Sequence, residues 1–266
     1  MRIGFIGGGA MGEAMVSAVL KKGEAQPGHM MVSDVSNERR EFLSSKYGLG
    51  VTADNAEAAE GAKLLVLAVK PQEFSNVAGG LRGKLTAGQT VLSIMAGVPI
   101  ARISRELNHG EIVRAMPNTA ALVGEAMSVW TASGSVSEQG RSAAARVLAA
   151  MGRELQVHDE KYLDMATAVN GSGPGFIFLF LEALIDGAVA IGLRPEVAAE
   201  LVVQTMFGSA VLARDTGKSP AELRAMVTSK GGTTAAGLQA LEDAGLRAAA
   251  GAAVRAAYDR AKELGG

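Results

Sequence analysis

The sequence has no cysteine, one tryptophan and three histidines among 266 residues. Without thiols there can be no disulfide, cysteine nucleophile or zinc–sulfur site, and such a composition fits a reducing cytoplasm. His29, His109 and His158 lie far apart in the chain, without the spacing of metal ligands or of a hydrolase triad. We therefore expect no metal and no Ser-His-Asp chemistry, and we expect a cytoplasmic protein.

The charge is nearly balanced, with a formal net charge of -1 and no basic block, so we expect no nucleic acid and no membrane as a partner. Hydrophobic residues make up 48% and charged residues 20%, which is typical of a globular protein. Residues 176–193 are strongly apolar, but Glu182 and Asp186 interrupt them on one helical face. This pattern favours a buried or subunit-interface helix over a membrane span.

Glycine is abundant, and its most informative use is at the start of the chain. An apolar run at residues 3–6 predicts a buried strand, and Gly7, Gly9 and Gly12 follow in the spacing G-x-G-x-x-G before a helix at residues 10–22. Such a turn lets a dinucleotide pyrophosphate approach the backbone at a helix N-terminus. The predicted cofactor residues of this turn are Gly7, Gly8, Gly9, Ala10, Met11 and Gly12.

A second predicted strand, residues 30–34, ends in Asp34, about where dinucleotide folds place the residue that contacts the ribose. Its carboxylate would accept a hydrogen bond from a 2′-hydroxyl and repel a 2′-phosphate, which favours NAD. Groups that could hold the phosphate instead follow at Asn37, Arg39 and Arg40. Alternatively, Ser36 is an ordinary helix cap and residues 38–40 are a solvated first turn. The sequence leaves the cofactor choice open.

Strands and helices alternate over the first half, with further strands expected at residues 51–52, 64–69, 91–94, 112–116 and 155–157. This order predicts an α/β fold, a doubly wound Rossmann-type parallel sheet, whose ligands lie at the carboxyl ends of the strands. Those ends supply the remaining cofactor candidates, which are Ala68, Val69, Lys70, Pro71, Ala96, Gly97 and Asn118.

The pattern changes near residue 161. We expect residues 1–160 to form the dinucleotide-binding domain and residues 161–266 an all-helical domain for dimerisation and substrate binding. Its helices are predicted at residues 163–170, 176–193, 195–216, 219–228 and 234–266. Because residues 176–193 are apolar nearly all round, we expect a second subunit to cover them in an obligate homodimer.

Two glycine-rich stretches interrupt these helices. Residues 170–175 could be a plain helix stop and start or part of a site. Residues 227–238 combine glycines with the hydroxyls of Thr228, Ser229, Thr233 and Thr234 before a new helix. Consecutive backbone N–H groups there would suit a substrate carboxylate.

Residues 3–12, 68–72, 116–119 and especially 228–238 resemble the pyrroline-5-carboxylate reductases, and the resemblance covers essentially the whole chain. It implies NAD(P)H-dependent reduction of 1-pyrroline-5-carboxylate to L-proline, the last step of proline biosynthesis. It also implies dimers or rings of dimers, and NADP(H) as cofactor with NAD(H) possible. The chain departs from the family at Lys230, where many members have proline, and at Asp34, where a small or amide residue is usual.

The resemblance also implies roles for single residues. Thr234 would be the catalytic residue, with its hydroxyl near the ring nitrogen of the imine, while Ala68, Lys70 and Asn118 would line the nicotinamide half of the cofactor site. The substrate carboxylate would be held by Ser229, Gly231, Gly232 and Thr233, with Thr234 beside them.

Two other functions are considered. A β-hydroxyacid dehydrogenase needs a lysine base one helical turn after a glycine-rich segment, but residues 171–175 are followed by Phe176 and the next lysine is Lys218. A non-catalytic nucleotide sensor would have no need of the hydroxyls of Thr233 and Thr234. Both features favour the reductase.

Overall fold

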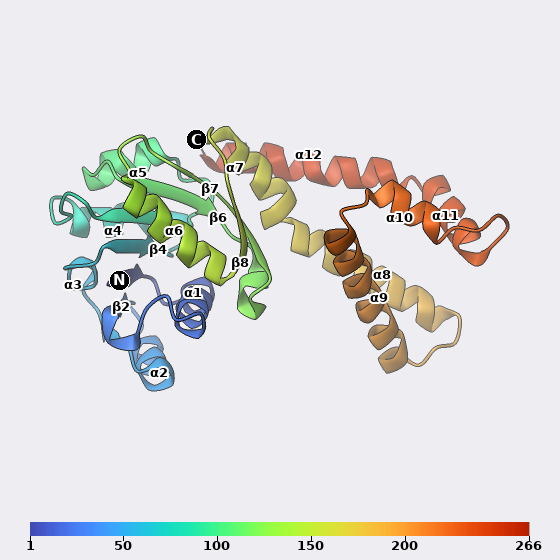
Figure 1. The fold of residues 1–266 in the computed structure, drawn as a ribbon, viewed down its shortest axis with the longest axis horizontal. Helices are drawn as coiled ribbons and strands as arrows, with labels where there is room; N and C mark the ends of the chain where they lie inside the picture. Colours follow the sequence, from blue (N-terminus) through green and yellow to red (C-terminus); the bar gives the residue numbers. More distant parts are fainter. Residues whose placement is uncertain (266) are drawn as a thin grey trace. The chain divides into compact units, whose positions relative to one another are not determined.

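The computed structural model describes residues 1–265, with a single eight-stranded sheet in the N-terminal part (Figure 1). The strand order is β3-β2-β1-β4-β5-β6-β7-β8, and every neighbouring pair is parallel except β6 and β7. The strands are β1 (Ile3–Ile6), β2 (Met30–Ser33), β3 (Gly50–Thr52), β4 (Leu64–Leu67), β5 (Thr90–Ser93), β6 (Ile112–Met116), β7 (Ala126–Ala132) and β8 (Gly152–Gln156).

Helices cover both faces of the sheet. The first face carries α1 (Ala10–Lys21) and α6 (Glu138–Ala150), and the second α3 (Asn55–Ala59), α4 (Phe74–Leu81) and α5 (Ile100–Leu107). Alternate residues of β4 point to opposite faces, so that Leu64 and Val66 pack with α1 while Leu65 and Leu67 pack with α4. This explains the uninterrupted apolar run, and it confirms the predicted Rossmann-type fold.

The sheet departs from the parallel arrangement in one place. β7 (Ala126–Ala132) was not predicted, and it runs antiparallel to β6 after the short turn η3 (Thr119–Val123). Its polar side chains Ser128 and Thr131 are almost completely buried, which hides the apolar pattern of a core strand. Bounds also differ, because β4 ends at Leu67 and β8 begins at Gly152.

The remaining helices are α2 (Asn37–Tyr47) in the sheet domain and those that follow the sheet: α7 (Lys161–Ala166), the π-helical turn η4 (Thr167–Gly171), α8 (Gly173–Ala190), α9 (Pro195–Thr216), α10 (Pro220–Met226), α11 (Thr233–Asp243) and α12 (Leu246–Gly265). Two further short helical turns are η1 (Pro27–His29) and η2 (Pro71–Glu73), both in the sheet domain.

Two helix predictions need correction. Residues 170–175 are not a stop and a start, because helical structure continues from Lys161 to Ala190 through η4, where the N–H of Ser172 donates to the carbonyl of Thr167. The predicted helix at residues 234–266 is instead two helices. Gly245, with a φ of 78°, lies between them.

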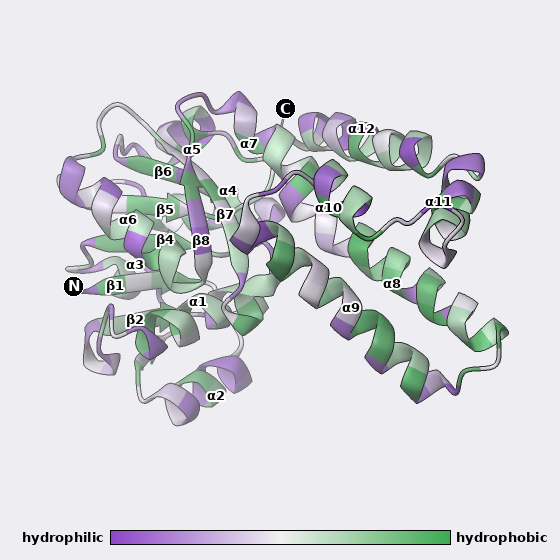
Figure 2. Cartoon of the chain, turned by 45° about the vertical axis from the view of Figure 1, so that its right-hand side comes forward, coloured by the Kyte–Doolittle hydropathy of each residue, from purple (hydrophilic) through white to green (hydrophobic). Residues whose placement is uncertain are grey.

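Contacts divide the chain into two compact units. One comprises Met1–Pro174 with Ala256–Gly266, and the other Gly175–Arg255. The second unit is all-helical, and Figure 2 shows strongly hydrophobic stretches along α8 and α9. No side chain of α8 is buried within this single chain.

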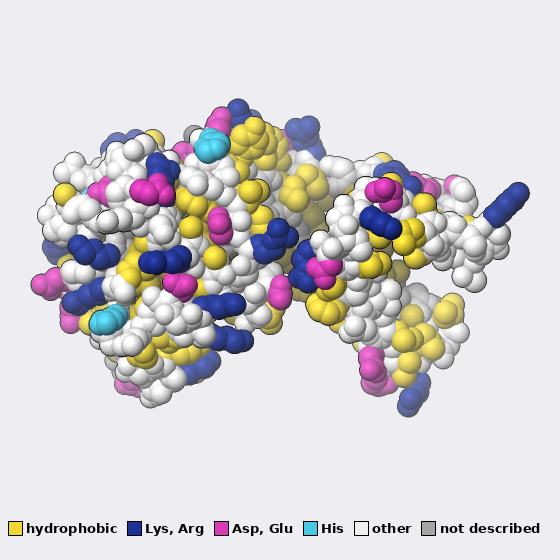
Figure 3. Space-filling model, viewed as in Figure 1, with side chains coloured by type: hydrophobic (Ala, Val, Ile, Leu, Met, Phe, Trp, Pro, Cys, Tyr) yellow, Lys and Arg dark blue, Asp and Glu magenta, His cyan; other side chains and the backbone are white. Residues whose placement is uncertain are grey.

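Two helical stretches, Lys161–Ala190 and Pro195–Thr216, are long and apolar enough to cross a membrane by length and composition alone. In the most apolar 18-residue window of each stretch, none and 6% of the residues are buried, and large apolar side chains such as Phe178, Leu179 and Phe207 are 59%, 67% and 60% exposed. Figure 3 shows exposed hydrophobic side chains over this helical unit. Surfaces of this kind are covered by a partner or by lipid.

Candidate cofactor and substrate site

The glycine turn after β1 has the geometry that a pyrophosphate site needs. Gly7 has a φ of 99° and its N–H donates to the carbonyl of Ser33 at 2.8 Å. A Cβ on Gly12 would lie 2.2 Å from the carbonyl oxygen of Gly7, so the helix packs tightly on the turn. A Cβ on Gly9 would meet nothing within 4 Å, so at this position the turn leaves space that a bound group could fill.

A cleft of about 600 Å³ opens beside this turn at the carboxyl ends of β1, β2 and β4. It brings together six of the predicted cofactor residues, which are Gly7, Gly9, Asp34, Ala68, Val69 and Lys70. Sequence reasoning missed the others that line it: Ile6, Ser33, Val35, Asn55, Glu73, Asn76 and Val77. Ser33, Val35 and Asn55 could have been expected from the rule that ligands lie at strand ends.

The remaining predicted cofactor residues do not line this cleft. Ala10, Met11 and Gly12 form the first turn of α1, and Pro71 begins η2. Gly97 lies in the loop after β5 with a φ of 70°, next to Ala96. Gly8 and Asn118 make hydrogen bonds of their own.

Asp34 is held in place by the backbone. Its carboxylate accepts from the N–H of Gly8 at 2.8 Å and from the N–H of Ser36 at 2.9 Å. The Ser36 hydroxyl in turn accepts from the N–H of Arg39, so Ser36 is the helix cap that the sequence offered as one alternative. The carboxylate thus lines the cleft in a fixed orientation.

Glu13, in the first turn of α1, collects three donors from α2. It pairs with Arg39, and it accepts from Lys46 and from the Tyr47 hydroxyl at 2.9 Å each. Its partial burial acts to raise the pKa, but the hydrogen bonds from Arg39, Lys46 and Tyr47 outweigh this effect and lower the pKa of Glu13 to about 2. This cluster was not predicted from the sequence.

The lowered pKa of Glu13 predicts that the folded state becomes less stable in acid. A carboxyl whose pKa is depressed in the folded state stabilises the fold above its unfolded pKa, and this contribution is lost as pH falls from about 4.5 towards 2. Glu13→Gln should therefore reduce the free energy of unfolding by about 1–2 kcal/mol at pH 7 and by progressively less below pH 4.5. Urea titrations followed by the fluorescence of the buried Trp130 check this. A cost that does not change with pH would contradict it.

A second polar cluster joins the π-helical turn to the sheet. The Asn170 amide donates to the carbonyls of Met116 and Met127 at 3.0 and 2.9 Å, and its oxygen accepts from the amide of Asn118 at 3.0 Å. Nearby on β6, the buried Arg114 pairs with Glu160 at 2.8 Å and Asp164 at 3.1 Å. Asn170 therefore orients Asn118 at the end of β6.

The predicted substrate residues lie in the other unit, in the loop after α10 and the first turn of α11. Gly231 has a φ of 73°, and Gly232 is the N-cap of α11 but supplies no side chain to its first turn. Thr233 and Thr234 begin the helix and are exposed. Thr228 has a different role from its neighbours, because its hydroxyl donates to the carbonyl of Arg224 at 2.6 Å and closes α10.

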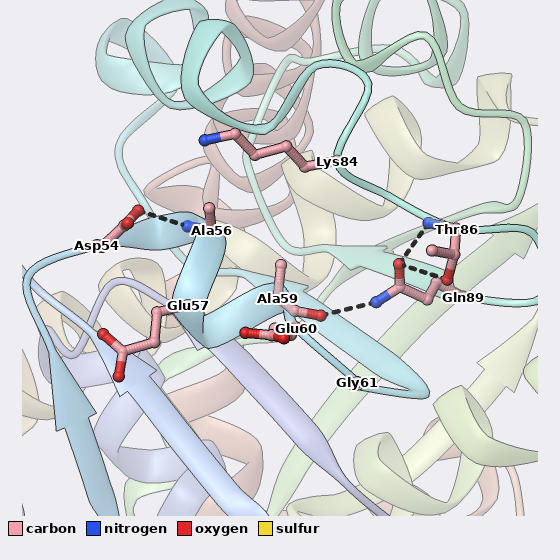
Figure 4. A pocket seen from close by; sticks show the side chains of 9 residues that line it. All are labelled: Asp54, Ala56, Glu57, Ala59, Glu60, Gly61, Lys84, Thr86 and Gln89. Atoms are coloured by element: carbon pink, nitrogen blue, oxygen red, sulfur yellow. Dashed lines mark hydrogen bonds between the residues drawn. The ribbon is translucent and has the colours of Figure 1, made fainter.

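A separate cavity of about 360 Å³ lies at the opposite edge of the sheet, beside the residues that lead into β4 and β5 (Figure 4). The side chain of Gln89 lines this cavity, but its polar atoms are already hydrogen-bonded within the protein. Its amide donates to the carbonyls of Ala59 and Ala62, and its oxygen accepts from the N–H of Thr86. These bonds fasten the loop before β5 to the end of α3, which is a structural role.

The fold, the glycine turn and the cleft define the class: a protein with a dinucleotide-binding domain followed by a helical domain. Residues 160–264 match the family described as pyrroline-5-carboxylate reductase dimerisation, and residues 2–97 match the one described as NADP oxidoreductase coenzyme F420-dependent.

Relatives match over nearly the full length. The chain is similar to pyrroline-5-carboxylate reductases of Methanosarcina acetivorans, at 42% identity over 99% of this chain and 98% of the relative, and of Arabidopsis thaliana, at 36% over 99% and 95%. A reductase structure from Coxiella burnetii has a TM-score of 0.94 at 36% identity, covering 100% of this chain and 98% of that one. One from Plasmodium falciparum with NADP bound has a TM-score of 0.89 at 29% identity, with the same coverage. The chain belongs to the pyrroline-5-carboxylate reductase family.

Proposed function

We propose that this chain reduces 1-pyrroline-5-carboxylate to L-proline with NADPH or NADH, the last step of proline biosynthesis. The observation that carries the proposal is similarity to named reductases over the whole chain, at up to 42% identity among those compared. In this proposal the open space at Gly9 serves the cofactor, and the glycine-rich segment before α11 serves the substrate.

In this proposal residues 1–160 hold the cofactor. The backbone at Gly9 and the N-terminus of α1 face the pyrophosphate, Asp34 faces the adenosine ribose, and Ala68, Lys70 and Asn118 lie towards the nicotinamide. The reduced nicotinamide supplies the hydride when bound. The Asn118 amide donates to the side-chain oxygen of Asn170, whose own amide donates to the carbonyl of Met116, and these bonds hold the Asn118 amide in one orientation.

Residues 161–266 bind the substrate in this proposal. The backbone around Ser229, Gly231, Gly232 and Thr233 holds the carboxylate at the start of α11, where unpaired N–H groups and the helix dipole favour an anion. The Thr234 hydroxyl hydrogen-bonds the ring nitrogen and orients the imine. A protonated imine accepts hydride readily, so positioning and charge complementarity can replace a strong general acid.

The helical domain also forms the homodimer in this proposal. A groove of about 310 Å³ between α8 and α9 is lined mainly by apolar side chains, among them Phe180, Leu184, Val202 and Met206. Together with the exposed apolar side chains of α8, it offers a surface that a second copy would cover. Rings of such dimers in the cytoplasm are the proposed final assembly, with no nucleic acid or membrane partner.

The reaction is tested by its product. Purified protein incubated with pyrroline-5-carboxylate and a reduced cofactor should form proline, detected by mass spectrometry, and should form none when either compound is omitted. Cofactor binding without proline formation would instead support the non-catalytic alternative.

The position of the Asp34 carboxylate in the cleft leads to a prediction about cofactor choice. Asp34→Ser should raise the ratio of kcat/KM for NADPH to that for NADH by about tenfold, because it removes a carboxylate that would repel a 2′-phosphate. Asp34→Asn is the matched variant, since its amide oxygen can still accept from the Gly8 N–H, while the charge and the acceptor for the Ser36 N–H are lost. If neither variant changes the ratio, Asp34 does not face the ribose.

A further inference from the structure

Cationic side chains that could bind a 2′-phosphate follow β2, but the structure shows them engaged elsewhere. We propose that Glu13 is a specificity-determining residue: by holding Arg39, it makes this chain favour the dinucleotide without a 2′-phosphate. The inference rests on the proposed function, in that it requires the cleft to bind a nicotinamide dinucleotide.

Arg39 is held at one edge of its guanidinium. Nε donates to the carbonyl of Gly8 and Nη2 pairs with Glu13, and the side chain is only 25% exposed. The same carboxylate also holds Lys46. Because these two nitrogens form one edge of the planar guanidinium, Arg39 must break both bonds before it can clamp a phosphate with that edge.

Arg40, the other cation near the end of β2, is occupied as well. It donates to the carbonyls of Asp34 and Val35 at 2.7 and 3.1 Å, and to the amide oxygen of Asn37 at 3.0 Å. Neither Arg39 nor Arg40 lines the cleft, whereas Asp34 does. A 2′-phosphate beside Asp34 would thus meet a fixed carboxylate, while the two arginines that follow β2 are bound to other groups.

Glu13 is the partner that a single substitution can remove cleanly. In Glu13→Gln an amide oxygen still accepts a hydrogen bond from α2, but the positive charge of Arg39 is no longer neutralised. Arg39 then becomes available to a phosphate placed beside Asp34. Glu24→Gln is the matched control, because Glu24 follows the other end of α1 and pairs with Arg146 at 3.5 Å.

The test is calorimetric titration of the full-length protein with ADP-ribose and with its 2′-phosphorylated form, which measures affinity without turnover. The wild-type protein should bind ADP-ribose at least about tenfold more tightly, and Glu13→Gln should reduce that preference by about tenfold, whereas Glu24→Gln should not change it. Arg39→Gln alone should change the preference less than about twofold, and Arg39→Gln added to Glu13→Gln should cancel the gain.

Three results would overturn the inference. The first is a wild-type protein that binds both nucleotides equally. The second is an Arg39→Gln variant that loses affinity for the phosphorylated nucleotide alone, because Arg39 would then already bind the phosphate. Since this variant leaves Glu13 intact, it keeps the proposal testable even if Glu13→Gln fails to fold. The third, binding of neither nucleotide, would contradict the proposed function itself.

Discussion

Gly9→Ala should weaken binding of either dinucleotide by about 100-fold and leave the fold intact. The backbone at Gly9 has a φ of −62°, which alanine adopts without strain, and its new Cβ would meet no protein atom within 4 Å. That methyl group would occupy the space beside the helix N-terminus in which we place the pyrophosphate. Titration of cofactor fluorescence measures the affinity, and thermal unfolding measures the fold.

Gly12→Ala is the informative contrast. Its Cβ would lie 2.2 Å from the carbonyl oxygen of Gly7, so it should destabilise the domain itself by about 1–3 kcal/mol. The two variants thus separate a glycine needed by the ligand from one needed by packing. Normal cofactor affinity in Gly9→Ala would mean that the pyrophosphate lies elsewhere.

Thr234→Ala should lower kcat by about 100-fold with little change in cofactor affinity. Thr234 is exposed at the start of α11, and no side chain caps that helix, so the hydroxyl does not serve as its cap. In our proposal it hydrogen-bonds the ring nitrogen of the substrate, and Thr234→Ser should therefore restore most of the rate. Steady-state kinetics with saturating cofactor measure both.

Thr228→Ala is the matched control for Thr234. Its hydroxyl closes α10 through the carbonyl of Arg224, so its loss should lower stability more than turnover. An unchanged rate in Thr234→Ala would remove the proposed role of that hydroxyl.

Much of the sheet domain could be predicted because its signals are local. The glycine spacing after β1 and the continuous apolar run of β4 identify a buried strand and its turn within a few residues. β7 was missed because Ser128 and Thr131 are buried on it, an environment that depends on β6 and β8. The π-helical turn was missed because Asn170 and the glycines after it are ordinary helix-ending residues out of context.

The site, too, could be predicted only where a local pattern marks its residues. Strand ends place Asp34 and Lys70 in one cleft, as the fold rule requires. The Glu13–Arg39 pair joins residues 26 apart on different helices, and no local pattern reveals it. The apolar sequence of α8 predicted a surface that a second subunit covers. The match of residues 160–264 to a dimerisation family agrees with this prediction.

The central claim is tested most directly by following the oxidation of NADPH and of NADH, in parallel, when the purified protein meets pyrroline-5-carboxylate. We expect rapid oxidation that depends on the substrate, with NADH the better cofactor because Asp34 and Glu13 disfavour a 2′-phosphate. No oxidation of either cofactor, despite their binding, would contradict the proposed reaction and favour another imine or a non-catalytic role.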